Sequence, residues 1–195
     1  MNLSELDLTS DIKNMTFLDQ TIITDIDNIT FTNCKFENIN FTNIKVTRVI
    51  FDNCKFTNCI FQTLNTQSIL NCTFKDCKIL GLNIYDMSII KNTEFIDCNL
   101  KYLILDKVKI NNTDFINCNL DDGEINEVSL SKVEIKNTSI RNTNINKTNL
   151  KDIDFRSCDI SKTIFSIDSL KGIIVTPYQA LNLSTLLGIQ IGDEI

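Results

Sequence analysis

The sequence predicts a repeat fold in which one short unit recurs along almost the whole chain. Large apolar residues recur every five positions, first from Phe31 to Phe61 and later from Phe95 to Leu170, and we call each of them a centre. All twelve Phe occupy centres, counting Phe17 as an early one, and all eight Cys stand two residues before a centre. A helix repeats about every 3.6 residues and a strand about every two, so neither gives this period.

The composition agrees with a repeat fold. The chain has 195 residues, of which 43% are hydrophobic, which fits one domain with enough apolar side chains for a core. It has one Pro and five Gly, too few for an ordinary globular chain with many tight turns.

The unit resembles that of the pentapeptide-repeat family: a small residue, a polar residue, a central Leu or Phe, and two further polar residues. The similarity covers residues 12–170. It implies an all-β fold, a right-handed quadrilateral β-solenoid with four pentapeptides per coil and with the centres and small residues pointing inward. We expect about eight coils, stacked about 4.8 Å apart. Since no coil can bury its core alone, both ends need caps.

A coil of 20 residues fits if three irregularities are assumed. These are three additional residues between Phe61 and Ile69, one additional residue before Ile90, and one residue fewer between Ile22 and Ile26. The first face then contains Ile12, Phe31, Phe51, Phe74, Phe95, Phe115, Ile135 and Phe155.

The same register places a second face beside the first. Its centres are Phe17, Phe36, Phe56, Ile79, Leu100, Leu120, Ile140 and Ile160. The small residues before them form a ladder rich in cysteine: Met15, Cys34, Cys54, Cys77, Cys98, Cys118, Thr138 and Cys158. The three additional residues fall in residues 62–68 (QTLNTQS), which are expected to bulge from one edge, either as a tolerated surface insertion or as a contact loop.

The chain divides into a solenoid over residues 1–172, with an irregular first coil over 1–30, and a C-terminal element over 173–195. Residues 173–175 are expected to form a short strand and residues 177–187 a helix. Thr176 is a good N-cap, Pro177 suits the first helical position, Gln179 completes a capping box and Gly188 suits the helix end. The helix is expected to cap the last coil.

The sequence indicates no catalytic residue, no cofactor and no metal site. The chain has no His, which removes the commonest general base and metal ligand. The cysteines are expected to point inward, where a thiol stays protonated. Sulfur atoms stacked in one line do not give a tetrahedral Cys₄ site, and no glycine-rich phosphate loop is present. An enzyme is therefore disfavoured.

Surface charge is the most informative functional signal. The net charge is −6, which disfavours direct binding of nucleic acid and leaves basic protein partners open. Four acidic residues lie just before centres at 20-residue spacing, and we call them the acidic column: Glu94, Asp114, Glu134 and Asp154. Lys136 and Arg156, on the next outward positions, would offset part of the repulsion. Lys35, Lys55 and Lys78 form a basic column on the second face.

Two interpretations of the acidic column stay open: a solvated face, or a row that imitates DNA phosphates. The family resemblance implies the second, since several relatives bind DNA gyrase as DNA mimics. It also implies a homodimer joined through the C-termini, for which the candidate surface is Ala180, Leu181, Leu183, Leu186 and Leu187. The alternative is a scaffold with an unrelated protein partner. Without a signal peptide or an 18-residue apolar run, we expect a cytoplasmic protein that does not enter a membrane.

Overall fold

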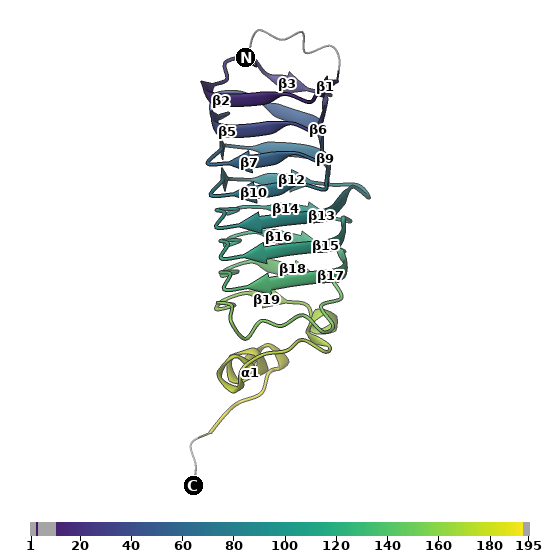
Figure 1. Ribbon diagram of the computed structural model, residues 1–195. Helices are drawn as coiled ribbons and strands as arrows, with labels where there is room; N and C mark the ends of the chain where they lie inside the picture. Colours follow the sequence, from purple (N-terminus) through teal and green to yellow (C-terminus); the bar gives the residue numbers. More distant parts are fainter. Residues whose placement is uncertain (1–2, 4–10, 193–195) are drawn as a thin grey trace.

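The computed structural model describes residue 3 and residues 11–192, which form a rod of about eight stacked coils with one helix at its C-terminal end (Figure 1). All strand pairs are parallel and join into one sheet that winds around the rod. The strands are β1 (Ile12–Lys13), β2 (Thr16–Thr21), β3 (Ile26–Asp27), β4 (Thr30–Thr32), β5 (Lys35–Asn40), β6 (Val46–Asp52), β7 (Lys55–Thr57), β8 (Ile60–Phe61), β9 (Leu64–Leu70), β10 (Thr73–Lys75), β11 (Lys78–Ile79), β12 (Leu82–Ile84), β13 (Ile89–Ile96), β14 (Ile104–Asp106), β15 (Lys109–Ile116), β16 (Glu124–Asn126), β17 (Ser129–Lys136), β18 (Asn144–Asn146) and β19 (Ile164–Phe165). The predicted β-solenoid is confirmed.

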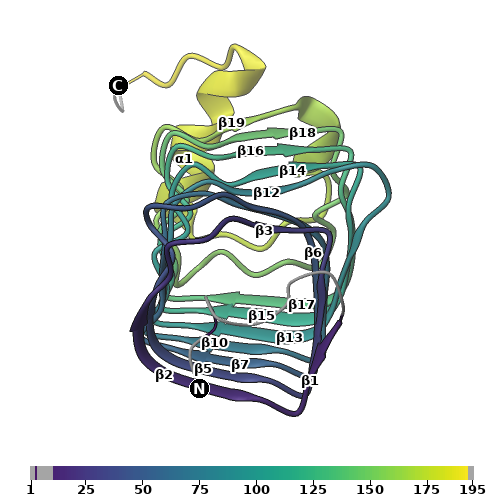
Figure 2. The ribbon, with the colours of Figure 1, turned by 90° about the horizontal axis from the view of Figure 1, so that it is seen from above.

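Each coil has four sides, as the view along the rod shows (Figure 2). We name the sides by one coil: face A contains Ile110, face B Phe115, face C Leu120 and face D Ile125. Strands β13, β15 and β17 each run through faces A and B. Strands β14, β16 and β18 build face D. Face C is held mostly by single bridges, such as that between Asn99 and Asn119.

The chain turns most corners at a residue with positive φ, and most of these residues are Asn or Asp. These two side chains tolerate the left-handed region better than other non-glycine residues. Their amides also bond from coil to coil: Asn53 donates to Asn33 at 2.6 Å, and Asn58 to Asn38 at 2.8 Å. The many asparagines of the sequence therefore have a structural role, and the corners need little glycine.

The core is a set of columns of like side chains. On face B six phenylalanines stack with ring centroids 4.4–5.1 Å apart: Phe17, Phe36, Phe56, Phe74, Phe95 and Phe115. All six are at most 5% exposed. Such offset or parallel ring pairs are worth about 0.5–1.5 kcal/mol beyond the burial of their area.

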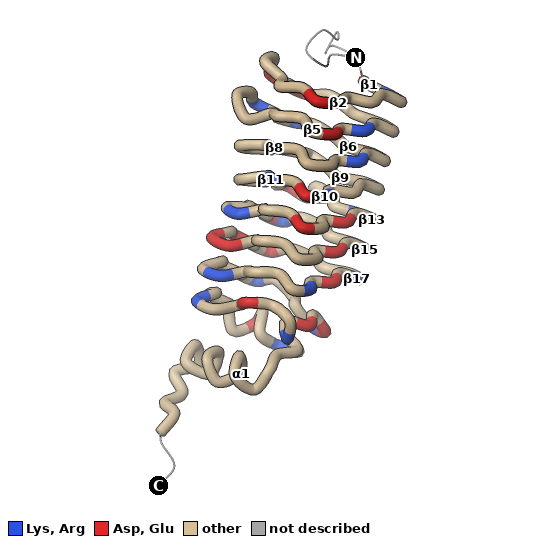
Figure 3. The backbone as a smooth tube through the Cα atoms, turned by 60° about the vertical axis from the view of Figure 1, so that its left-hand side comes forward, with Lys and Arg blue, Asp and Glu red and all other residues tan. Residues whose placement is uncertain are grey.

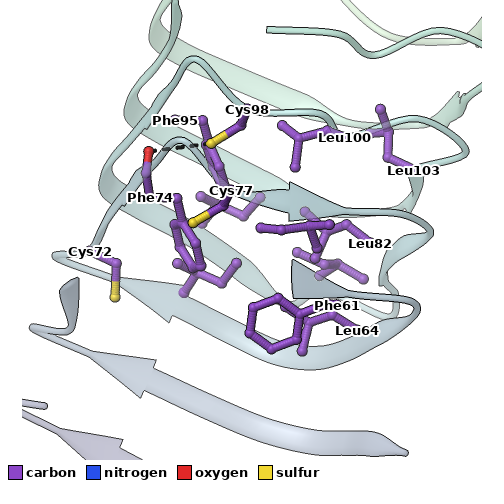
Figure 4. Packing of buried hydrophobic residues seen from close by; sticks show 14 of the residues in the cluster. Phe61, Leu64, Cys72, Phe74, Cys77, Leu82, Phe95, Cys98, Leu100 and Leu103 are labelled. Carbon is purple, nitrogen blue, oxygen red and sulfur yellow. Dashed lines mark hydrogen bonds between the residues drawn. The ribbon is translucent and has the colours of Figure 1, made fainter. Parts of the chain in front are cut away.

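The position two before many of the centres takes Cys or Thr, a small side chain that can donate a hydrogen bond. Cys98 Sγ donates to the carbonyls of Ile96 and Phe74 at 3.3 and 3.4 Å, the latter drawn in Figure 4. Thr138 Oγ1 donates to Lys136 and Phe115 in the same way, at 2.9 and 3.2 Å. A thiol or hydroxyl fits here because these two carbonyls accept its hydrogen bond, whereas an unpaired polar group inside the rod would be costly. All eight cysteines are free.

The register assumed for residues 62–68 is wrong. Phe56 pairs with Phe74, and Phe51 pairs with Ile69 instead of Phe74. This coil is shorter than 20 residues, as the bond from the Cys54 amide to the Cys72 sulfur, 18 positions on, shows. Residues 62–68 thus lack two residues instead of holding three additional ones. They run into β9 inside the wall. The two residues are missing between Phe61 and Leu64, because Ile60 pairs with Asn40 at a spacing of 20 and Leu64 with Val46 at a spacing of 18.

The shift splits the predicted cysteine ladder between two faces. Cys34, Cys54 and Cys72 precede face B centres, whereas the others precede face C centres: Cys59, Cys77, Cys98, Cys118 and Cys158. Figure 4 shows Cys77 and Cys98 in one column and Cys72 apart from them. The prediction holds from Cys98 to Cys158, where the ladder and the centres beside it share face C.

The other two irregularities are where the sequence placed them. Ile12 pairs with Phe31 and Ile26 with Val46, which leaves one residue fewer between Ile22 and Ile26. The additional residue before Ile90 opens a loop at residues 85–88, which protrudes from the wall between β12 and β13 (Figure 2). Met87 at its tip is 59% exposed. The protruding loop is therefore this one, and not residues 62–68.

The C-terminal segment forms the predicted cap. After the 3₁₀ turn η2 (Ile167–Leu170), helix α1 (Pro177–Ser184) continues into the 3₁₀ turn η3 (Thr185–Leu187). Thr176 and Gln179 form the capping box, and Gly188 has φ 73°. The Gln179 amide also donates to the carbonyls of Phe155 and Cys158, both at 2.9 Å, which fixes the helix to the last coil. The expected strand at 173–175 is reduced to one bridge between Ile174 and Asp154.

Parts of two predicted segments lie outside the described residues: most of residues 1–10 of the irregular first coil, and residues 193–195 of the C-terminal element. Among the helices of the described residues, none is both long and apolar enough to cross a membrane.

Replacing Leu120 with Ala is expected to lower the free energy of unfolding by about 2–5 kcal/mol, because the change leaves a cavity inside the rod. Leu120 is only 3% exposed. Equilibrium denaturation in urea measures the change. Leu18→Ala is the control, since Leu18 is 47% exposed and its loss should matter by no more than about 0.5 kcal/mol. Equal stability of the two variants would contradict the inward position of Leu120.

Candidate functional site

One straight row on face B carries both signs of charge. Strand pairing aligns its members coil by coil: Lys35, Lys55, Thr73, Glu94, Asp114 and Glu134. Figure 3 shows the row changing from blue near β5 to red near β13, β15 and β17. The prediction that Lys35 and Lys55 lie on a different face from the acidic column is therefore wrong, because the shortened coil moves them into line with it. Lys78 alone lies apart, on face C.

Glu94, Asp114 and Glu134 are aligned as predicted, but the prediction is wrong for Asp154, which no pairing joins to Glu134 because residues 150–156 leave the wall. The acidic column is partly neutralised from the side. Lys136 Nζ lies 2.6 Å from Glu134, and Arg156 Nη2 lies 2.7 Å from Asp154. Both cations stand on the outward position after the centre, as expected from the sequence. Glu94 and Asp114 have Ile96 and Ile116 at that position, and no ion pair joins either carboxylate to another described residue. The uncompensated negative charge is thus confined to two adjacent coils.

The ion pairs favour the charged forms of Asp154 and Lys136. Hydrogen bonds from the Arg156 side chain and backbone lower the pKa of Asp154 to about 2. The Glu134 carboxylate raises the pKa of Lys136. Each pair joins one carboxylate to one cation, so this end of the acidic column carries little net charge.

A second charged row lies on face C and was missed by sequence reasoning. Asp121 is almost fully buried, and it accepts hydrogen bonds from the Ser139 hydroxyl at 2.5 Å and from the Arg141 guanidinium at 2.9 Å. Burial raises the pKa of Asp121, but the bonds from Ser139 and Arg141 outweigh it and the net direction is down. Lys101, Asp121 and Arg141 are spaced by 20 residues, which is the signal that could have found this row.

The C-terminal end of the rod exposes apolar surface. Leu181, Leu186 and Leu187 are 38–53% exposed, and Ala180 also faces solvent. Leu183 differs from the other members of the candidate dimer surface, because it is half-buried and packs against the core. The helix therefore covers the last coil with Leu183 and presents its other leucines outward. Clustered exposed apolar side chains mark an interaction site more often than scattered ones do.

Two of the interior thiols, those of Cys118 and Cys158, are held in the protonated form. Burial raises the pKa of the Cys158 thiol, and the neighbouring Cys98 sulfur together with burial raises that of Cys118. A protonated thiol is neither a good nucleophile nor a metal ligand. Across residues 11–192, no three His, Cys, Asp or Glu side chains come together in a way that could hold a metal ion.

Comparison with known proteins agrees with the five-residue period. The family model for pentapeptide repeats (8 copies) matches residues 24–62, and the model for the pentapeptide repeat region matches residues 108–175. Together the two segments cover more than half of the chain. No curated protein sequence matches.

Solved structures also match this chain, and three of them have low sequence identity to it. A trypsin-treated form of QnrB1, a plasmid-mediated fluoroquinolone resistance protein, is 17% identical, with 94% of this chain and 100% of that chain covered and a TM-score of 0.34. A second trypsin-treated QnrB1 is 18% identical, covers 93% and 99%, and has a TM-score of 0.37. HetL, involved in heterocyst differentiation regulation in the cyanobacterium Nostoc, is 8% identical, covers 84% and 90%, and has a TM-score of 0.34. On the period, the coil geometry and the two family matches, the chain belongs to the pentapeptide-repeat family.

Proposed function

We propose that this protein has no catalytic activity and acts in the cytoplasm by presenting face B to a protein partner. The observation that carries the proposal is the row of carboxylates on a flat, rigid wall. Parallel pairing fixes Glu94, Asp114 and Glu134 at successive coils, about 4.8 Å apart. A partner meets these charges already in place, without the loss of side-chain and loop freedom that a mobile surface would incur on binding.

The most specific candidate for the partner is a type II topoisomerase, either DNA gyrase or topoisomerase IV. The carboxylates of the acidic column would then imitate DNA phosphates. The family resemblance supplies this partner, and the negative row supplies the chemistry. A groove that binds DNA is lined by cations that neutralise phosphates. Glu94 and Asp114, which form no ion pair with a described cation, are the residues we expect to contact it.

A second candidate is a scaffold that binds an unrelated protein. The change of sign along the row favours it, because Lys35 and Lys55 would repel a uniformly basic groove. Lys35 is paired with Glu37 at 2.6 Å, but no carboxylate pairs with Lys55 among the described residues. A partner with a matching change of sign would fit the full length of the row, and complementary charge of this kind contributes mainly to specificity and association rate.

We also propose that two copies associate through the C-terminal end, using Ala180, Leu181, Leu186 and Leu187. These side chains face away from the solenoid, while Leu183 and Gln179 hold the helix in place. A dimer would remove this apolar surface from water and would cap both rods at once.

Reversing the charge of Asp114 is expected to weaken topoisomerase binding strongly, because Asp114→Lys places a cation where the partner has cations. The readout is gyrase supercoiling with and without a quinolone, together with binding at increasing salt, which should weaken the parent complex. Glu124→Lys is the matched control: it makes the same change of charge on face D, opposite face B, at an exposed side chain.

Two outcomes of that assay contradict the proposal at different levels. Equal gyrase responses of Asp114→Lys and Glu124→Lys would mean that the acidic column is not part of the binding surface. If the parent protein has no effect on gyrase or topoisomerase IV, a topoisomerase is not its partner and the scaffold function is the one that stands.

Introducing a charge into the exposed leucines is expected to separate the dimer. Leu187→Asp should sediment as a monomer at micromolar concentration while the parent sediments as a dimer, because burial of an unpaired carboxylate at the interface is costly. Met87→Asp is the control, since Met87 is exposed to a similar degree (59% against 53%) in the distant loop. A parent that sediments as a monomer would contradict the dimer.

A further inference from the structure

Strand β17 has one open edge. On its N-terminal side it pairs with β15 over both faces A and B. On the other side, no strand of residues 11–192 pairs with it, and only the Cys158 thiol reaches it, donating to the Ile135 carbonyl at 3.5 Å. Faces C and D continue past this level, through the bridge from Ser139 to Asp159 and the pairing of β18 with β19. The wall is therefore interrupted on faces A and B alone.

The chain that would continue the wall does not bond to β17. At 20-residue spacing, residues 150–156 should lie against β17, with Phe155 on Ile135. Their bonds to the following residues are regular, since the Asp152 and Phe155 amides donate to the carbonyls of Gly172 and Ile174 at 2.9 and 2.8 Å, but no backbone hydrogen bond or bridge joins the described residues 150–156 to β17. Seen along the rod, the green segment that follows β18 lies inside the outline of β13, β15 and β17 (Figure 2).

The displacement leaves apolar side chains of β17 open to solvent. Leu130, Val133 and Ile135 are half-buried, whereas their counterparts one coil earlier are fully buried: Ile110, Thr113 and Phe115. A groove of about 530 Å³ runs along the open edge and contains Val133 and Ile135. Its charged lining includes the pairs Glu134–Lys136 and Arg156–Asp154, which largely cancel. An exposed strand edge of this kind is a template for another strand.

The C-terminal tail carries the matching piece. Residues 189–193 read IQIGD, with apolar residues at the small and central positions of the unit and an Asp at the corner position. Residues 133–137 (VEIKN) of the open wall follow the same pattern. Yet Ile189 and Ile191 are 51% and 55% exposed and lie in no strand of the described chain. The tail thus contains one repeat unit that its own rod does not stack.

We propose that the tail of a second copy of this chain adds to the open edge of β17 as a parallel strand. The repeat register sets the contacts: the Ile135 amide would donate to the Gln190 carbonyl and the Gln190 amide to the Val133 carbonyl, as Leu100 and Asn119 do with their neighbours. Ile189 and Ile191 would then enter the groove beside Val133 and Ile135. Main-chain bonds would supply affinity and the alternating side chains specificity.

The second copy is the occupant because of the direction of the tail. Beyond α1 the tail leads away from the solenoid and from the edge of its own β17 (Figure 1). The groove also opens near the C-terminal end of the rod, where the apolar surface of α1 lies. This inference deepens the proposed dimer and rests on it, since the exchanged strands would join the same two copies.

Hydrogen exchange of the Ile135 amide tests the proposal on the full chain. At concentrations where the parent is a dimer, this amide should exchange at least about tenfold more slowly than in the dilute monomer, because the added strand accepts its hydrogen bond. Ile191→Asp should remove the slowing, since the carboxylate would enter the apolar groove. Gln190→Asp is the matched control. At position 190 the new carboxylate would point outward, so exchange of the Ile135 amide should remain slow in the dimer.

Two other outcomes of the exchange experiment would overturn the proposal, and they can be told apart. Slow exchange that does not depend on concentration would mean that each chain binds its own tail. A parent that dimerises while the Ile135 amide exchanges as fast as in the monomer would leave the helix-mediated dimer standing and exclude strand addition. The gyrase assay is independent of all these results, so failure of the topoisomerase function would not affect them.

Discussion

The hydrogen-bond register between successive coils is the constraint on which the rest of this structure depends. Each coil supplies the backbone partners of the next, so a side chain's neighbours above and below are fixed by pairing and not by local sequence. The register stacks the phenylalanines of face B, aligns the Cys and Thr donors with their carbonyls and places charges in rows. A deficit of two residues in residues 62–68 instead of an excess of three, a difference of five residues, rotates everything before the short coil by one face relative to everything after it.

The local parts of the fold could be predicted from the sequence. The five-residue period, the buried centres and the capping box of Thr176 and Gln179 depend on residues close together in the chain. The register across residues 62–68 could not be predicted, because an excess of three residues and a deficit of two both restore the period. The cysteine ladder favoured the wrong choice, since faces B and C both accept Cys before their centres, as Cys54 and Cys77 show.

Coil length also determines where the residues of the candidate site lie. The acidic column lies within coils of regular length, so its members are aligned as the spacing predicts through Glu134. Lys35 and Lys55 lie beyond the short coil, and only the pairing of Lys55 with Thr73 and of Thr73 with Glu94 brings them into the same row. The open edge of β17 had no sequence signal, since residues 150–155 keep the period although they leave the wall.

The central claim is that one row on face B joins Lys55 to Glu94 across Thr73. A zero-length carbodiimide cross-link, mapped by mass spectrometry of the monomer, tests it directly, because two long side chains about two coil spacings apart, roughly 10 Å, can meet. The pair Lys35 and Glu37, at 2.6 Å, is the internal standard for reactivity. The account predicts an amide between Lys55 and Glu94 within one chain. Reaction of the standard pair without any Lys55–Glu94 product would contradict the register.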